Sequence, residues 1–211
     1  AAMPTAAHHR LLPRLQVKGA LQEGALYIER AADEELESAL LAGQYCYVLA
    51  PRQIGKSSLR LRTARKLAGG GVRCVHLDLT ILGGQDDFEP RRGWYFSMIS
   101  AIAAQLRLTD PLPFWEHRGD ALPVFHFGRY MREHVLVQIN APVVIFIDEI
   151  DYLRSLPFDT DEFIDAIRAY HDARGEDLEY QRLTFCLLGV AAPADLIRNA
   201  RITPFNIGQA V

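Results

Sequence analysis

The stretch YCYVLAPRQIGKSSL, residues 45–59, decides the fold of this chain. Its first part, residues 45–50, is a short run of aromatic and β-branched side chains, which is typical of a strand inside a parallel sheet. A tight loop that ends in Gly55-Lys56-Ser57 follows, and residues 59–67 continue with the composition of a helix. A strand, a loop and a helix in this order predict a phosphate-binding P-loop.

The spacing of this motif has a physical reason. A helix N-terminus leaves several backbone N–H groups without partners and carries the positive end of the helix dipole, so it attracts anions. Gly55 lets the backbone approach phosphates, Lys56 can reach the β and γ phosphates, and Ser57 offers its hydroxyl to Mg²⁺. We therefore expect the nucleotide phosphates to be bound by the loop and the first helical turn, namely Pro51, Arg52, Gln53, Ile54, Gly55, Lys56, Ser57 and Ser58.

One position departs from the usual motif, because Ala50 stands where the first glycine is expected. Pro51 biases Ala50 towards an extended conformation, so the strand can continue to that point without a positive φ. The chain has only three lysines, at positions 18, 56 and 66, which makes a chance Gly-Lys-Ser rare. The alternative interpretation is an ordinary strand-to-helix connection with a surface lysine.

A second informative stretch is VVIFIDEID, residues 143–151. A continuous apolar run that ends in acids indicates a central parallel strand whose carboxylates emerge at the carboxyl edge of the sheet, as in a Walker B motif. Asp148 would hold Mg²⁺ beside Ser57, and Glu149 would orient or deprotonate the water that attacks the γ-phosphate. We expect Lys56 and Asp148 to meet across neighbouring strand ends. The alternative is a strand end capped by solvated acids.

Strand and helix patterns alternate along the chain. We expect strands at 45–50, 72–80, 143–148, 183–190 and within 203–211, and helices at 33–42, 59–67, 94–106, 123–138, 161–174 and 195–199. This alternation predicts an α/β chain with the three-layer P-loop NTPase fold around a mostly parallel five-stranded sheet. Residues 1–20 are expected to be a tail and residues 21–211 the core, and we expect no C-terminal lid within these 211 residues.

Composition sets further limits. The chain has 211 residues, of which 49% are hydrophobic, so it can form one large domain or at most two small ones. Its net charge of −3 gives no reason to expect nucleic acid or an anionic membrane as a partner. The three cysteines lie in apolar runs, as expected of small buried side chains in a reducing compartment. Without a membrane-spanning segment or signal peptide, we expect a cytoplasmic protein.

Five blocks in order resemble the AAA-like domain family, a group of bacterial AAA+/STAND-type signalling NTPases often joined to WD-repeat or other sensor and effector domains. The blocks are residues 27–30, 45–60, 146–151, 182–185 and 203–208. The resemblance covers roughly residues 20–211 and implies an ATP-dependent regulatory switch that uses ATP/ADP and Mg²⁺. It also implies fused or associated sensor and effector domains and a nucleotide-dependent homo-oligomer. By analogy, Tyr27, Ile28 and Arg30 would flank the adenine, with plain packing as the alternative for Tyr27 and Ile28.

Four functions compete. The first is slow, Mg²⁺-dependent ATP hydrolysis in which the bound state controls an attached partner. The second is an ATP-gated binding module that does not hydrolyse. The third is a DNA-associated initiator-type AAA+ ATPase, for which the helix residues Arg60, Arg62, Arg65 and Lys66 could form a basic patch, although an acidic chain argues against it. The fourth is a small-molecule kinase, which the acid pair disfavours.

Two elements of regulated hydrolysis are not assigned from the sequence. Arg168 and Arg174 lie on the helix before the fourth strand, where AAA+ subunits often present an arginine finger in trans, but a solvated helix face is the better interpretation of both. The fourth strand ends in Gly189 and Val190, which offer no polar side chain to sense the γ-phosphate.

Overall fold

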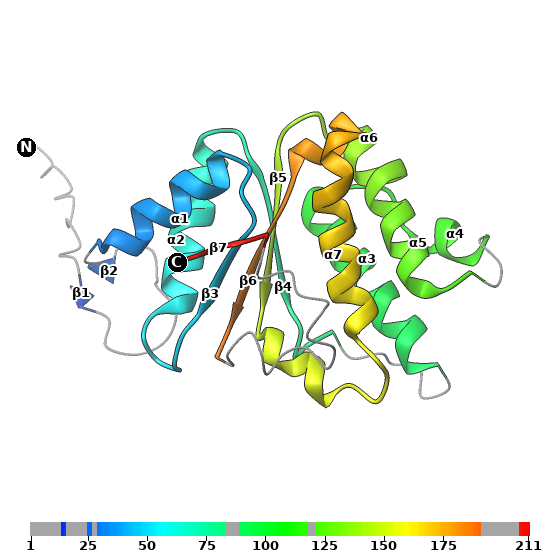
Figure 1. The fold of residues 1–211 in the computed structure, drawn as a ribbon, viewed down its shortest axis with the longest axis horizontal. Helices are drawn as coiled ribbons and strands as arrows, with labels where there is room; N and C mark the ends of the chain where they lie inside the picture. Colours follow the sequence, from blue (N-terminus) through cyan, green and yellow to red (C-terminus); the bar gives the residue numbers. More distant parts are fainter. Residues whose placement is uncertain (1–13, 16–24, 27–28, 83–88, 118–120, 191–206) are drawn as a thin grey trace, which may run out of the picture.

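A five-stranded parallel sheet forms the centre of the fold (Figure 1). The computed structural model describes residues 14–15, 25–26, 29–82, 89–117, 121–190 and 207–211. The strands of the sheet are β3 (Cys46–Leu49), β4 (Arg73–Asp78), β5 (Val143–Asp148), β6 (Leu183–Gly189) and β7 (Gln209–Ala210). A separate parallel pair consists of β1 (Arg14–Leu15) and β2 (Ala25–Leu26). The predicted five-stranded α/β architecture is therefore confirmed.

The order of the strands corrects one expectation. Across the sheet the order is β4-β5-β6-β3-β7, so β6 lies between the P-loop strand β3 and the acidic strand β5. The ends of β3 and β5 are therefore not neighbours, contrary to the prediction for Lys56 and Asp148. A local sequence pattern identifies a strand but contains no information about which strand pairs with it, and β6 is contributed by residues far along the chain.

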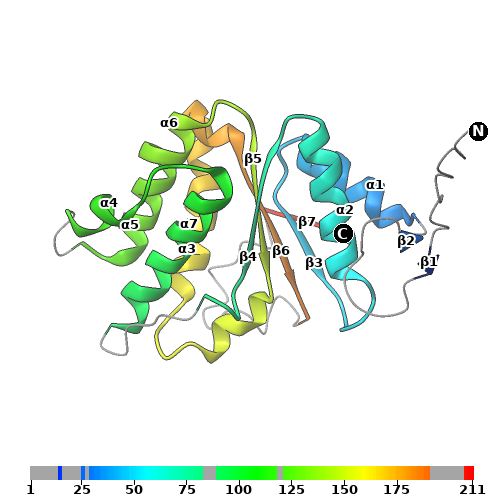
Figure 2. The ribbon, with the colours of Figure 1, turned by 180° about the vertical axis from the view of Figure 1, so that it is seen from behind.

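Helices cover both faces of the sheet and make three layers. On one face lie α1 (Ala31–Leu41) and α2 (Lys56–Gly69), and on the other lie α3 (Pro90–Leu106), α5 (Pro123–Tyr130) and α7 (Asp161–Asp172), as Figures 1 and 2 show from opposite sides. Strand β5 is buried along its whole length. Its alternating residues divide between the two apolar cores, with Ile145 and Ile147 on the α3 side and Val144 and Phe146 on the α2 side.

Several short elements differ from the expected ones. The helix expected over 123–138 is divided into α5, a π-helical turn at Met131–Val135 and α6 (Leu136–Gln138). The segment 109–123, which contains three prolines, includes a short helix, α4 (Leu112–Glu116). Turns of 3-10 helix occupy Ile150–Ser155, Ala173–Gly175 and Leu178–Arg182. The helix predicted at 195–199 lies outside the described residues. Within those residues, no helix combines the length and apolar character needed to cross a membrane.

Strand β4 is an edge strand, and one side chain occupies part of its exposed edge. The Gln105 side chain accepts a hydrogen bond from the backbone N–H of His76 and donates one to its carbonyl, both at 2.8 Å. The amide of Gln105 thus imitates the backbone of a further strand and satisfies groups that an edge would leave open. This contact also fixes the backbone beneath the His76 side chain.

A candidate nucleotide site at the carboxyl edge of the sheet

The loop between β3 and α2 has the backbone of an anion-binding turn. Ala50 still pairs with the sheet, because its N–H donates to the carbonyl of Gly189 at 3.0 Å, as expected for a strand that continues to that point. The loop then turns through positive φ at Gln53 (68°) and Gly55 (95°). Gly55 is the N-cap of α2 and has no side chain to cap the first turn, so the N–H groups there are left to face an anion.

Lys56 begins the helix and reaches back across the loop. Its ammonium group donates to the carbonyl oxygens of Ala50 (2.6 Å) and Pro51 (3.1 Å). The predicted phosphate-binding residues stay close to solvent: Pro51, Arg52, Gln53, Ile54 and Ser57 are exposed, and Gly55, Lys56 and Ser58 are half-buried. The motif therefore places one positive charge, a helix N-terminus and the Ser57 hydroxyl at one accessible position.

Arg30 lies against this loop. Its guanidinium donates to the carbonyl of Ile54 at 2.8 Å, and a Cβ added to Gly55 would lie 3.4 Å from the same guanidinium. The backbone N–H of Arg30 donates to the buried carboxylate of Asp33 at 2.9 Å, which anchors Arg30 at the start of α1. Arg30 thus lies against the loop between β3 and α2, and its expected place beside the adenine stays a prediction. Tyr27 and Ile28, its expected companions, lie outside the described residues.

Asp148 ends strand β5 and is almost entirely buried, with 8% of its surface exposed. Its Oδ1 atom accepts a hydrogen bond from the backbone N–H of Glu149 at 3.0 Å. Glu149 is half-buried, and its backbone has a φ of 54°. A positive φ is uncommon for a residue other than glycine, and such backbone conformations often occur at functional sites. Both predicted acids therefore emerge at the same edge of the sheet as the P-loop.

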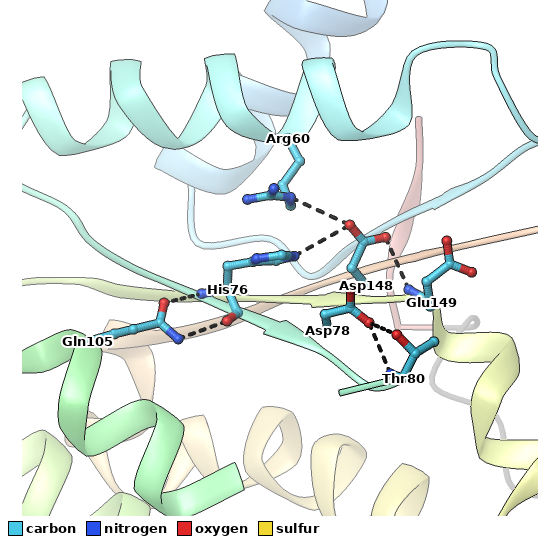
Figure 3. A network of polar contacts seen from close by, with 7 residues as sticks. All are labelled: Arg60, His76, Asp78, Thr80, Gln105, Asp148 and Glu149. Carbon is cyan, nitrogen blue, oxygen red and sulfur yellow. Dashed lines mark hydrogen bonds and ion pairs between the residues drawn. The ribbon is translucent and has the colours of Figure 1, made fainter. Parts of the chain in front are cut away.

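Two further side chains face Asp148 (Figure 3). The Oδ2 atom of Asp148 lies 3.6 Å from Nε of Arg60 and 3.4 Å from Nε2 of His76. Burial by itself would raise the pKa of the Asp148 carboxyl, but the contact with His76, the Glu149 N–H and the Arg60 charge together lower this pKa below its ordinary value. Asp148 is therefore ionised at neutral pH.

Sequence reasoning missed the role of Arg60 and His76 at this site. In the sequence, Arg60 stands out only as a member of a basic patch that the acidic chain argues against, and His76 lies within the strand expected at residues 72–80. A signal for Arg60 was present, since it follows Lys56 by four residues and so lies on the same face of α2. His76 could be recognised only from the register, which pairs Asp78 with Asp148 and places His76 two residues earlier on the same face of β4.

Other polar side chains near the ends of β4 and β5 form hydrogen bonds within the chain. The Asp78 carboxylate accepts two hydrogen bonds from Thr80, one from its backbone N–H at 2.9 Å and one from its hydroxyl at 2.6 Å. Asp151 accepts a hydrogen bond from the N–H of Val190 at 2.7 Å and so secures the end of β6. It lies in the first turn of the 3-10 helix Ile150–Ser155, which follows β5.

The charged residues that were considered for a basic patch or an arginine finger form contacts within the chain. On α2, Arg62 forms an ion pair with Glu29, and Lys66 one with Glu37 at 2.7 Å. Arg174 lies among backbone carbonyls of its own chain, and Arg168 pairs with Asp172 along α7 at 3.8 Å.

An apolar groove between α5 and α7 lies away from the site and contains no P-loop residue; it is lined in part by Leu122, Phe125, Ala166 and Tyr170.

The fold and the site together define a class: a three-layer α/β protein with a P-loop and an acidic strand end at one sheet edge. The AAA-like domain family matches residues 16–211, and the chain belongs to this family. An uncharacterized WD repeat-containing protein of Synechocystis sp. is 43% identical over 189 residues, which cover 88% of this chain and 16% of that protein. The chain thus corresponds to a small part of the length of this relative.

Solved structures with the same fold include two archaeal ORC proteins of Aeropyrum pernix. The ORC2 protein in its ADPNP-ADP complexes matches with a TM-score of 0.58 and 16% identity, over 88% of this chain and 48% of that one. The ORC1 protein in complex with DNA matches with a TM-score of 0.53 and 14% identity, over 85% and 43% of the two chains. These similarities confirm the P-loop AAA+ fold.

Proposed function

We propose that this domain binds ATP with Mg²⁺, hydrolyses it slowly or only with a partner, and uses the bound nucleotide to control attached domains. One observation carries the proposal: the open N-terminus of α2, with Gly55 and Lys56, lies at the same sheet edge as the carboxyl groups of Asp148 and Glu149. A helix N-terminus with a lysine suits phosphates, and carboxylates at that edge suit a metal.

The residues present fit a magnesium-bound triphosphate. Mg²⁺ is usually held by one or two carboxylates together with phosphate oxygens, and Asp148 and the Ser57 hydroxyl are hard oxygen donors of this kind. Gly55 has a positive φ beside the Arg30 guanidinium, so a side chain there would narrow the space over the loop. We assign phosphate binding to residues 51–58 and metal binding to Ser57 and Asp148, and place Arg30, with Tyr27 and Ile28, on the nucleoside side.

Glu149 is the proposed proton acceptor for the attacking water. Its backbone N–H is bound to Asp148, so its position follows that of the metal-binding carboxylate. Phosphoryl transfer requires mainly positioning and charge stabilisation, which Lys56 and the metal would provide. We assign no arginine to the γ-phosphate, because Arg168 and Arg174 both have contacts within their own chain.

The regulatory role rests on the family and on the relative. A domain that makes up 16% of a WD repeat-containing protein is one of several parts, and a nucleotide-binding part can control the others. We therefore propose that sensor or effector domains, and in one nucleotide state a second copy of the domain, are its partners. We also propose the cytoplasm as its location.

The test is ATP binding and phosphate release by two variants. Lys56→Ala should lower ATP affinity at least about tenfold, since a charge-assisted contact contributes about 1.5–3 kcal/mol. Glu149→Gln should retain ATP and stop phosphate release. Lys66→Ala, which removes the other lysine of α2, is the matched control and should behave as the wild type. Unchanged affinity of Lys56→Ala in calorimetry would refute the phosphate site.

Two other functions would give different results. A non-hydrolysing ATP-gated module predicts negligible phosphate release both from the wild type and from Glu149→Gln. A DNA-associated ATPase is suggested by the ORC1 structure, which was solved with DNA. It predicts DNA affinity that falls steeply with salt, whereas the paired charges on α2 favour no such binding.

A further inference from the structure

The two oxygens of Asp148 have different surroundings. Oδ2 faces the Arg60 and His76 nitrogens under helix α2, whereas Oδ1 faces the backbone N–H of Glu149 at the strand end (Figure 3). Nε of Arg60 and Nε2 of His76 are both buried and make no hydrogen bond of regular geometry within the described residues. Buried nitrogens of this kind normally have a polar partner, and for these two the partner is Oδ2 of Asp148, at a longer distance than in a regular hydrogen bond.

Both residues that contact Oδ2, Arg60 and His76, lie on regular secondary structure. Arg60 is on α2 one turn beyond Ser57, and only 13% of its side chain is exposed. His76 is on β4, whose backbone is paired with β5 on one side and held by Gln105 on the other. The backbone of each residue is therefore held by a regular helix or strand.

Arg60 also links two parts of the site that the sheet does not link directly. The P-loop strand β3 and the acidic strand β5 are separated by β6, so no β-ladder joins these two strands directly. The Arg60 side chain makes this connection above the sheet, from the helix that contains Ser57 to the carboxylate at the end of β5.

We propose that Arg60, supported by His76, is a positioning residue that holds Oδ2 of Asp148, so that the carboxylate presents Oδ1 to a divalent cation at a fixed place relative to Ser57. This inference rests on the proposed ATP and Mg²⁺ binding and deepens it. It assigns to Arg60 no contact with the nucleotide.

The first test separates positioning from general structural support. Binding of ATP is measured by calorimetry with and without Mg²⁺ for the wild type, Arg60→Met, Arg60→Lys and the control Arg65→Met, which alters an exposed arginine of the same helix. In Arg60→Met, the increase in ATP affinity caused by Mg²⁺ should fall at least fivefold, while affinity without Mg²⁺ should change less than twofold. Arg60→Lys should restore part of the increase.

Three results would overturn the proposal. An unchanged Mg²⁺ effect in Arg60→Met would show that Oδ2 needs no partner. A larger Mg²⁺ effect would show that Arg60 competes with the cation for Asp148. An equal loss of affinity with and without Mg²⁺, together with a lower melting temperature, would show a purely structural role. If the wild type itself does not bind ATP, the proposed function fails, whereas normal wild-type binding with an unaffected Arg60→Met defeats only this inference.

A second measurement needs neither nucleotide nor metal. Urea unfolding of Arg60→Met, Asp148→Asn and the double variant forms a double-mutant cycle for the pair. We expect clear non-additivity, with the double variant less destabilised than the sum of the single ones. Strict additivity would show that the two side chains do not interact and would reject the arrangement on which the proposal depends.

Discussion

The replacement Arg174→Met gives the most direct test of how the chain is held together. The Arg174 guanidinium lies 4.5 Å from the centre of the Tyr45 ring. It also donates hydrogen bonds to four oxygens from three segments of the chain: the carbonyls of Gly43 (2.6 Å), Tyr180 (3.2 Å) and Leu183, and the hydroxyl of Thr184 (3.2 Å). Methionine approximates the apolar stem of the arginine side chain but removes every donor.

The expected loss of stability follows from these contacts. A hydrogen bond to a charged group contributes about 1.5–3 kcal/mol, but the contributions are not additive and water can reach part of this half-buried site. We therefore expect the free energy of unfolding to fall by about 3–5 kcal/mol. For a chain of this size, 1 kcal/mol corresponds to about 2–4 °C, so the melting temperature should fall by about 10 °C.

The assay is thermal and urea unfolding followed by circular dichroism. Arg168→Met is the matched control, because the Arg168 pair with Asp172 spans one turn of an exposed helix face and such pairs contribute only about 0.3–0.5 kcal/mol. A melting temperature of Arg174→Met within about 2 °C of the wild type would refute the structural role. Loss of phosphate release without loss of stability would point instead to an arginine that acts on a neighbouring subunit.

Three further predictions test the site and its surroundings. Gly55→Ala should lower ATP affinity at least about tenfold in calorimetry, since a side chain would have to adopt a φ of 95° beside the Arg30 guanidinium, and an affinity within twofold of the wild type would contradict this. Gly189→Ala should lower the free energy of urea unfolding by about 1–3 kcal/mol, because its Cβ would lie 2.5 Å from Cγ2 of Ile150; a change below about 0.5 kcal/mol would show that the contact relaxes. The pKa of Asp148 is lowered in the folded state, so its contribution to stability is present above the unfolded pKa of about 3.9 and is lost as the pH falls through the lower folded value. The difference in unfolding free energy between the wild type and Asp148→Asn should therefore change as the pH falls from about 5 to 2, and a constant difference would contradict the lowered pKa.

Patterns carried by short segments were predicted well. The β3 strand, the loop through Gly55 and the start of α2 follow from residues 45–59, because strand and helix periodicity and the glycine requirement are local properties. The apolar run that ends at Asp148 identified the buried strand β5 for the same reason. Two of the three cysteines, Cys46 and Cys186, are buried as expected, whereas Cys74 is half-buried.

Predictions that depended on partners far along the chain were less successful. The insertion of β6 between β3 and β5 results from strand pairing, which a pattern within one strand does not specify. The π-helical turn at Met131–Val135 interrupts an apparently regular helical pattern, and nothing in the local periodicity indicates it. The sequence favoured a solvated helix face for Arg174, whereas its guanidinium is bound to backbone carbonyls from other segments of the chain.

By itself, the sequence determined the class of this protein: a P-loop at residues 45–59, an acidic strand end at Asp148 and Glu149, and a parallel α/β sheet to hold them. Only the tertiary structure decided that Arg60 and His76 meet at one oxygen of Asp148, and that Arg30 lies on the P-loop. The physical reason is that backbone propensity and hydrophobic period act over a few residues, whereas the neighbours of a buried carboxylate are set by strand order, register and helix placement.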